Sequence, residues 1–264
     1  MTTSQAPPPA AESTIGYPRP ERPVIFCLPP AGGSVATFRP WLRMADEGTV
    51  LEPLNVRLIQ AELGRNGGQV TLVALAAAIA DLLPPDRPFI LAGHSLGGLL
   101  AYEAAFELFR RGARLPESVL VMGSRPPHDS SAEVFAPMID LDDEDFLDAM
   151  EAVGAVNPEL RNSPMRPLFL PALRRDLRVI TTYRPDVADR RRAQLPVPLV
   201  GWCGIADSLA PPDVVRGWQD YTLFPGLEVF QGGHFFPFDD AGPCLQALES
   251  LARVSPVANT LHKS

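Results

Sequence analysis

The serine within Gly93-His94-Ser95-Leu96-Gly97 is the residue of this sequence best placed for nucleophilic chemistry. The residues before it are apolar and strand-like, and those after it have a helical pattern, which is the context that a GxSxG turn requires. Such a turn presents the serine hydroxyl at the carboxyl edge of a sheet, and it needs small neighbours because strand and helix approach closely. The alternative is a glycine-rich turn whose serine only caps the helix, and the flanking pattern favours the nucleophile.

A serine hydroxyl needs a neighbouring base, and His234 is the histidine in the best position to supply one. It follows a strand-like run and two glycines in "LEVFQGGHFF". In hydrolases that use this turn, the histidine comes last along the chain, after the serine and an acid. The other histidines fit less well, since His94 lies inside the turn, His128 in a polar loop and His262 in the tail. The alternative for His234 is an ordinary loop histidine.

The base in turn needs an acid that orients it, and Asp207 in "GWCGIADSLAPP" is our choice. It follows a predicted strand that ends at residue 204, and it lies between the serine and the histidine in the chain. Four other aspartates are rivals. Two fall in a predicted helix and two come after the histidine, and they are Asp213, Asp220, Asp239 and Asp240.

A carbonyl attacked by the serine becomes an oxyanion, which two N–H groups must stabilise. One donor is expected to be Leu96, directly after the serine. The other is expected from the loop "LPPAGGS", where Pro29 and Pro30 have no N–H. Ala31 is therefore the nearest candidate, with Gly32 as the second choice.

Alternating strands and helices must position these groups. We expect one strand in the first part of residues 23–33 and a second that begins at Asn55. Further strands are expected at 88–93, 118–124, 197–204 and 227–233. We expect helices from Thr71 as N-cap to Pro84, at 96–111, at 211–222 and at 240–254. This order predicts an α/β fold with a mostly parallel sheet and helices on both faces.

The expected domain spans residues 23–255, between a disordered proline-rich N-terminus (1–22) and a flexible tail (256–264). The alternation stops at about 126–196, where the pattern is helical or irregular. We interpret this stretch as a helical lid over the sheet. It includes an acidic helix at 140–154 and a longer helix within 166–185 that we expect Pro171 to break.

Composition excludes several classes of protein. The net charge of −8 argues against general nucleic-acid binding. The N-terminus lacks the pattern of a signal peptide, and no apolar run is long enough to cross a membrane. Cys27, Cys203 and Cys244 have neither zinc-site spacing nor an even count for a disulfide framework, which indicates a cytoplasmic protein.

Five segments taken together resemble type II thioesterases of polyketide and non-ribosomal peptide biosynthesis, within the α/β-hydrolase fold. The resemblance runs from about Val24 to Phe238. Two departures are Pro30, where the family usually has histidine, and Ser208, where proline commonly follows the aspartate. The segments are "FCLPPAGGS", "GHSLGGLLAYEAA", "PALRRDLRVITTY", "GWCGIADSLAPPDVVRGWQDYT" and "LEVFQGGHFF".

The resemblance implies that Ser95 is the nucleophile, Asp207 the acid and His234 the base, with Ala31 and Leu96 as oxyanion donors. It implies hydrolysis of thioesters on the phosphopantetheine arm of acyl or peptidyl carrier proteins, in editing or release, with no metal or organic cofactor. A carboxylesterase or acyltransferase with the same triad is an alternative. A non-catalytic binding module of the same fold is another.

The same resemblance suggests where substrate and partner bind. Within the expected lid, Leu168, Phe169 and Leu170 are candidates to line the acyl chain, although they could equally pack the lid on the core. Carrier proteins are generally acidic, so docking to this acidic monomer needs a local basic patch. Three arginine clusters could provide it: Arg110, Arg111 and Arg114; Arg174, Arg175 and Arg178; and Arg190 to Arg192.

Overall fold

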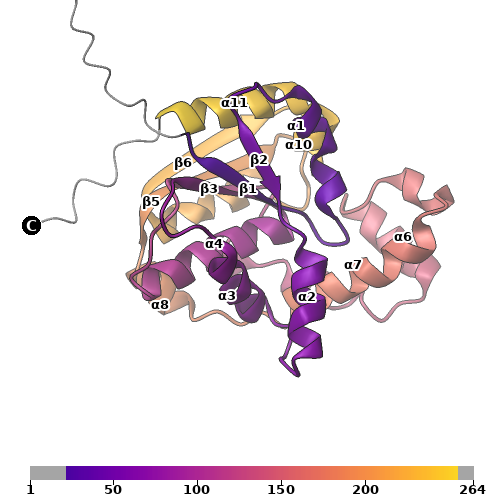
Figure 1. The fold of residues 1–264 in the computed structure, drawn as a ribbon. Helices are drawn as coiled ribbons and strands as arrows, with labels where there is room; N and C mark the ends of the chain where they lie inside the picture. The colour runs from indigo at the N-terminus through magenta and orange to yellow at the C-terminus, as the bar shows by residue number, and fades with distance from the viewer. Residues whose placement is uncertain (1–21, 255–264) are drawn as a thin grey trace, which may run out of the picture.

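Six parallel strands form one sheet in the order β2-β1-β3-β4-β5-β6 (Figure 1). The structure is a computed structural model and describes residues 22–254, so the expected disordered N-terminus and flexible tail lie outside the described residues. The parallel sheet confirms the predicted α/β fold, and it brings the carboxyl ends of all six strands to one edge. The strands are β1 (Val24–Leu28), β2 (Val50–Pro53), β3 (Phe89–His94), β4 (Ser118–Met122), β5 (Leu195–Gly204) and β6 (Thr222–Phe230).

Helices cover both faces of the sheet. Successive side chains of β1 point to opposite faces, so Phe26 packs into one buried cluster while Ile25 and Cys27 pack into the other. The first cluster lies under α2 (Val56–Arg65), α3 (Leu72–Leu82) and α4 (Leu96–Arg110). The second lies under α1 (Arg39–Met44), α10 (Phe236–Asp239) and α11 (Ala241–Val254), on the upper side in Figure 1.

The expected strand from Asn55 is wrong, because this segment forms α2. The Asn55 side chain accepts a hydrogen bond from the Leu58 amide at 3.2 Å, which caps the helix. Val56 and Ile59 recur at helical spacing and are buried. The strand at this point of the sheet is β2, whose alternating half-buried residues precede Asn55.

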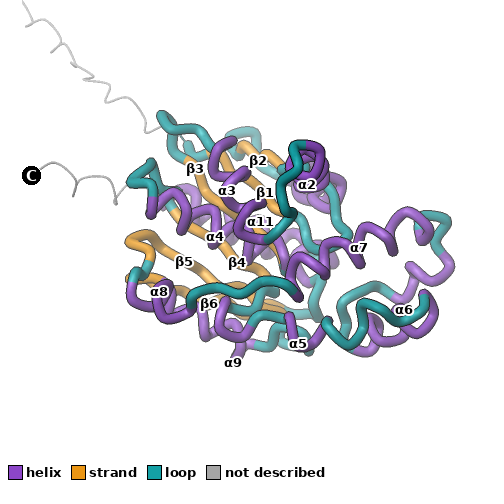
Figure 2. Tube along the Cα trace, turned by 90° about the horizontal axis from the view of Figure 1, so that it is seen from below, coloured by secondary structure: helices purple, strands orange, loops and turns teal. Residues whose placement is uncertain are grey.

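A helical insertion, defined here as residues 126–194, connects β4 to β5. It contains α5 (Ala132–Phe135), α6 (Asp143–Ala152), α7 (Arg166–Thr181) and α8 (Val187–Arg192). Figure 2 shows α6 and α7 extending away from one side of the sheet. The expected break at Pro171 is wrong, since α7 continues through it. The proline deprives only the carbonyl of Pro167 of a donor, and both residues are exposed, so water can replace the missing bond.

One further element differs from the sequence pattern, and one helix start agrees with it. The expected helix at 211–222 is a short α9 (Pro212–Val215) that tightens into a 3-10 helix over Arg216–Tyr221. The expected N-cap at Thr71 is confirmed, because its side chain accepts from the Ala74 amide at 3.2 Å. Within residues 22–254, no helix combines the length and apolar composition needed to cross a bilayer.

Candidate active site

Ser95 occupies a strained turn between β3 and α4, with φ of 54° and ψ of −116°. Among the described residues it is the one non-glycine residue with positive φ, a conformation that costs about 1–3 kcal/mol. The space around the turn explains its glycines, because a Cβ atom at Gly93 or Gly97 would overlap backbone carbonyl oxygens. The Ser95 side chain makes no capping hydrogen bond to α4, which removes the alternative of a simple cap.

His234 and Asp207 meet at the same edge of the sheet. Asp207 follows β5, and His234 follows β6 after two glycines. The His234 Nδ1 atom donates to Asp207 Oδ2 at 3.0 Å, and both side chains are buried. The second carboxylate oxygen accepts the amides of Leu209 and Ala210, each at 2.9 Å. This carboxylate therefore has a fixed orientation toward the imidazole.

The electrostatics of Asp207 keep this carboxyl group ionised. Burial, the largest influence, acts to raise its pKa. The hydrogen bond and charge of His234 and the two amides outweigh burial, so the pKa of Asp207 lies below its ordinary value. An ionised carboxylate at Nδ1 holds the proton on that nitrogen, which leaves Nε2 of His234 as the proton acceptor.

Ser95 and His234 line one small cavity of about 20 Å³, together with Ala31. Among the described residues, no hydrogen bond joins the Ser95 hydroxyl to the His234 ring. In enzymes without bound substrate, catalytic hydrogen bonds are often long and tighten only in the complex. Gly123, with φ of 51°, ends β4 beside the pair, and a Cβ there would lie 3.3 Å from both Asp207 Oδ2 and His234 Nδ1.

His94 contacts the backbone of His234, the candidate base, and the sequence analysis did not identify this contact. Its Nε2 donates to the backbone carbonyl of His234 at 2.8 Å, and its ring is fully buried. Burial first, and the charge of His234 second, lower the pKa of His94 from 6.5 to about 3. His94 is therefore neutral and holds the backbone at His234 in place.

The other aspartates and histidines considered as acid or base are not part of the His234–Asp207 pair. Asp220 pairs with Arg191 at 2.9 Å, and His128 hydrogen-bonds the hydroxyl of Tyr221 at 2.8 Å. The remaining aspartates, Asp213, Asp239 and Asp240, are exposed. His262 lies outside the described residues.

The loop after β1 forms a tight turn in which Gly33 N–H donates to Pro30 O at 2.9 Å. Gly32 has φ of 71°, and its N–H already donates to Asp176 Oδ2 at 2.8 Å, so it is not free to bind an oxyanion. Within residues 22–254, the amides of Ala31 and Leu96 have no acceptor. Leu96 directly follows Ser95, and Ala31 lines the same small cavity as Ser95.

The three residues expected to line the acyl chain are dispersed. Leu168 is 68% exposed, Phe169 contacts Gly32, and Leu170 is buried in the core. Other residues of the helical insertion face the cavity beside Ser95. The insertion contributes Phe135, Met150, Ala155, Leu173 and Leu177, and the other apolar residues that line the cavity are Pro30, Ala31, Leu209 and Phe235.

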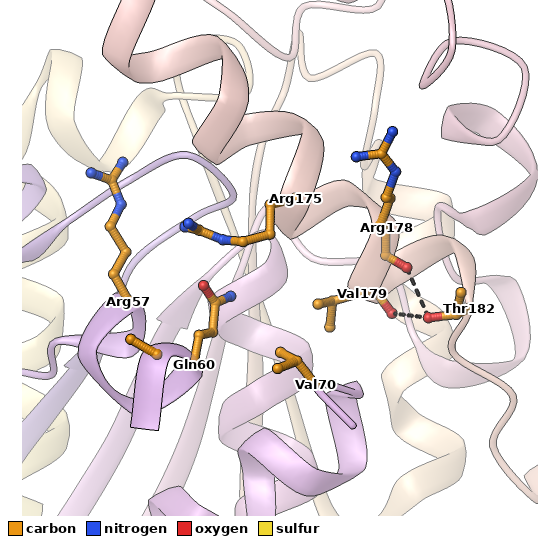
Figure 3. A pocket seen from close by; sticks show the side chains of 8 residues that line it. Arg57, Gln60, Val70, Arg175, Arg178, Val179 and Thr182 are labelled. Carbon is orange, nitrogen blue, oxygen red and sulfur yellow. Dashed lines mark hydrogen bonds between the residues drawn. The ribbon is translucent and has the colours of Figure 1, made fainter. Parts of the chain in front are cut away.

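Most of the candidate docking arginines are engaged locally. Arg110 and Arg111 pair with Glu107, Arg114 with Glu117, Arg190 with Glu103, and Arg192 with Asp189. Arg174 pairs with Asp143 and lies over the ring of Phe146. Figure 3 shows a different setting for Arg175 and Arg178, which line a cavity of about 350 Å³ between α7 and α2, together with Arg57 and Gln60.

Comparison with curated proteins finds relatives in biosynthetic pathways. A probable cadicidin biosynthesis thioesterase of Streptomyces griseus is 33% identical over 216 residues, which cover 80% of this chain and 57% of the relative. The AMB antimetabolite synthetase AmbE of Pseudomonas aeruginosa is 33% identical over 220 residues, but these are only 10% of that protein. The thioesterase PikA5 of Streptomyces venezuelae is 30% identical over 83% of this chain and 78% of its own length. The chain thus spans little more than half of the first relative and a small part of the second.

Solved structures agree with these relatives. The RedJ thioesterase from the prodiginine pathway of Streptomyces coelicolor superposes with a TM-score of 0.70 at 29% identity, covering 87% of this chain and 90% of its own. YbtT, a type II thioesterase from the yersiniabactin pathway, superposes with a TM-score of 0.70 at 25% identity, covering 89% and 94%. The family model for the thioesterase domain matches residues 23–251. The chain therefore belongs to the thioesterase domain family, with the α/β-hydrolase fold and the resemblance to type II thioesterases that its motifs indicated.

Proposed function

We propose that this protein is a serine thioesterase that removes acyl groups from the phosphopantetheine arm of carrier proteins in polyketide or non-ribosomal peptide biosynthesis. The observation that carries the proposal is the convergence of strained Ser95 and the buried His234–Asp207 pair on one cavity, in a chain of the thioesterase family. The named pathways of the relatives supply the substrate class.

The first half of the reaction forms an acyl-enzyme. Ser95 Oγ attacks the thioester carbonyl while Nε2 of His234 takes the hydroxyl proton. Asp207 holds the ring and stabilises its charged form. The amides of Ala31 and Leu96 stabilise the oxyanion. The carbon–sulfur bond then breaks, and His234 returns the proton to the departing pantetheine thiolate.

The second half releases the acid. His234 takes a proton from water as the water oxygen attacks the acyl-Ser95 carbonyl, and it returns this proton to Ser95 Oγ as the bond between the acyl carbon and that oxygen breaks. The products are the free acid, the carrier thiol and regenerated enzyme. These steps use only side chains of this chain and water, so the proposal includes no metal and no organic cofactor.

The helical insertion acts as a lid in this proposal. A cavity of about 20 Å³ holds about one water molecule, so it cannot contain an acyl chain of several carbons. Leu173 and Leu177 of α7 and Met150 of α6 form part of its wall. Movement of α6 and α7 would open the space that a longer acyl group requires.

The partner is proposed to be an acyl or peptidyl carrier protein that meets a cytoplasmic monomer. Arg175 and Arg178 are favoured as its contacts, because they line one cavity together, are about half exposed, and make long ion pairs of 3.4 Å with Asp176 and Asp140. The net charge of −8 and the free cysteines support a cytoplasmic protein that binds neither nucleic acid nor membranes.

Incubation of the purified protein with a panel of acyl-loaded carrier proteins, read by intact mass, tests the function. We expect loss of the acyl mass with the wild type and a fall of at least about 10³-fold in turnover for Ser95→Ala, with unchanged thermal unfolding. A higher rate on p-nitrophenyl esters than on carrier thioesters would favour a carboxylesterase. Failure of a fluorophosphonate probe to label Ser95 would indicate a non-catalytic module.

A further inference from the structure

Asp176 of α7 is a buried carboxylate that the proposed reaction does not use. It is 4% exposed although it lies on the helical insertion. Its Oδ2 accepts the Gly32 N–H at 2.8 Å, and its Oδ1 accepts the side-chain amide of Gln60 in α2 at 2.9 Å. The contact with Arg175 is longer, at 3.4 Å. A buried carboxylate needs hydrogen-bond partners that replace water. One of them here is the amide of Gly32, in the loop proposed to supply an oxyanion donor.

The loop itself is a turn with two accessible forms. Gly33 N–H donates to Pro30 O, and Gly32 has positive φ while Ala31 does not, which describes a type II turn. A flip of the central peptide would convert it to a type I turn with the same ends. In the flipped form the Ala31 carbonyl oxygen would face the Asp176 carboxylate, and the two would repel each other. Asp176 therefore selects one form.

The turn is also held from its other side. Arg57 of α2 donates to the carbonyl oxygen of Gly32, so the two peptide groups around this glycine are fixed by two different helices. The carbonyl of the Pro30–Ala31 peptide is held by Gly33, and in a trans peptide the N–H of Ala31 points the opposite way. Ala31 lines the cavity beside Ser95. The Pro30–Ala31 peptide is not the one that flips, so Asp176 acts on the Ala31 amide by fixing where the turn lies relative to Ser95.

The hydrogen bonds of Asp176 join α7 to the loop after β1 and to α2. Alongside them, α7 and α2 are separated by a cavity of about 350 Å³. In Figure 3, Arg175 of α7 extends across it toward Arg57 and Gln60. The Oε1 atom of Gln60 is buried and has no hydrogen-bond partner among the described residues. Phe169 and Leu173 of α7 also pack on Gly32, so displacement of α7 would break these apolar contacts together with the Asp176 hydrogen bonds.

We propose that Asp176 is a positioning residue that holds the turn carrying the Ala31 amide against α7, so that the oxyanion site is complete only when α7 is seated over the loop. The inference rests on the proposed function and adds a condition to it. A lid that has lifted to admit a substrate would leave the oxyanion donor unaligned. Closure of α7 would then restore the donor before Ser95 reacts.

Steady-state hydrolysis of an acyl-carrier protein by Asp176→Ala and Asp176→Asn tests the inference. Asp176→Ala is expected to lower kcat by about 10²-fold, the effect of losing one oxyanion donor, with KM changed less than about 3-fold. Asp176→Asn keeps an acceptor for Gly32 N–H, and its kcat should stay within about 5-fold of wild type. The matched control is Asp140→Asn, which removes the same charge from an exposed carboxylate of the insertion and should leave kcat unchanged.

A second measurement separates positioning from general loss of structure. An alkyl boronic acid forms a tetrahedral adduct on the serine, so its Ki should rise by the same factor as kcat/KM falls in Asp176→Ala. If that variant does not fold, Gln60→Leu removes the other hydrogen bond to Asp176 and should lower kcat by several-fold. Wild-type kcat in the folded variants, or a lower kcat with unchanged boronate Ki, would overturn the inference. An inactive wild type would instead refute the proposed function.

Discussion

At the residue scale, the neutral His94 beneath the base makes the stability of this protein depend on pH. Its pKa is 6.5 ordinarily and about 3 in the folded protein. Between these values the unfolded chain binds a proton that the folded chain excludes. The free energy of unfolding therefore falls as pH falls from 6.5 toward 3, by about 1.4 kcal/mol per pH unit. Above pH 6.5 His94 is neutral in both the folded and the unfolded chain, so it adds no further pH dependence.

His94→Gln tests this dependence, because a glutamine amide can still donate to the His234 carbonyl but does not titrate. We expect the variant to be less stable than wild type at pH 7, and to lose less stability than wild type between pH 6 and pH 4. Urea unfolding at each pH measures both slopes. Parallel curves for the two proteins would show that His94 is not the titrating group.

Residues with chemistry of their own were easier to predict than residues that act through the fold. Ser95, Asp207 and His234 could be chosen because a glycine-flanked turn and a fixed chain order constrain them. The roles of His94 and Asp176 depend on hydrogen bonds to residues 140 and 144 positions away. A single sequence does not indicate such pairs. The one local signal was the absence of an N–H at Pro30, which pointed to Ala31.

At the element scale, the end of α7 is attached to α4 by a buried polar cluster. The Tyr183 hydroxyl donates to Glu103 Oε1 at 2.5 Å, and Arg190 pairs with the same carboxylate at 2.7 Å while lying over the ring of Phe106. Tyr183→Phe leaves one lone pair of a buried carboxylate without its donor. We expect a loss of about 1.5–3 kcal/mol in the free energy of unfolding, measured by urea titration.

Tyr102→Phe is the matched control for this cluster. The Tyr102 hydroxyl is buried but has no hydrogen-bond partner among the described residues, so its removal should be neutral or stabilising. Equal losses in both variants would mean that the hydrogen bond to Glu103 contributes nothing beyond the shape of the ring.

Strands and helices with a clear sequence pattern were predicted correctly, whereas a short segment whose residues fit both a strand and a helix was not. The buried runs of β1 and β3 and the capped helix α3 followed from local signals. The segment after Asn55 has apolar residues both at strand spacing (Val56 and Leu58) and at helical spacing (Val56 and Ile59), and the Asn55 cap favours the helix that forms. Pro171 lies inside α7 without ending it. The exposure of Pro167 and Pro171 to water makes the lost hydrogen bond tolerable, and it is a tertiary property that the sequence pattern did not indicate.

At the scale of the whole molecule, the net charge of −8 would oppose approach of the proposed acidic carrier protein. This long-range repulsion and the proposed local attraction by Arg175 and Arg178 respond oppositely to salt. Screening weakens repulsion between the two net charges, and it also weakens contacts between exposed charges at the interface, since the Debye length falls to about 8 Å at 0.15 M. The direction of the salt effect on KM therefore reports which of the two dominates.

We expect the KM of the wild type for an acyl-carrier protein to rise when NaCl increases from about 20 mM to about 150 mM, because the arginine contacts are screened. In the double variant Arg175→Gln/Arg178→Gln the attraction is gone and only the repulsion remains, so KM should be higher at low salt and should fall as salt increases. An uncharged N-acetylcysteamine thioester of the same acyl group serves as the control and should show no such dependence in either protein. The same salt response in both proteins would place carrier docking on another face of the molecule, while leaving the chemistry at Ser95 unaffected.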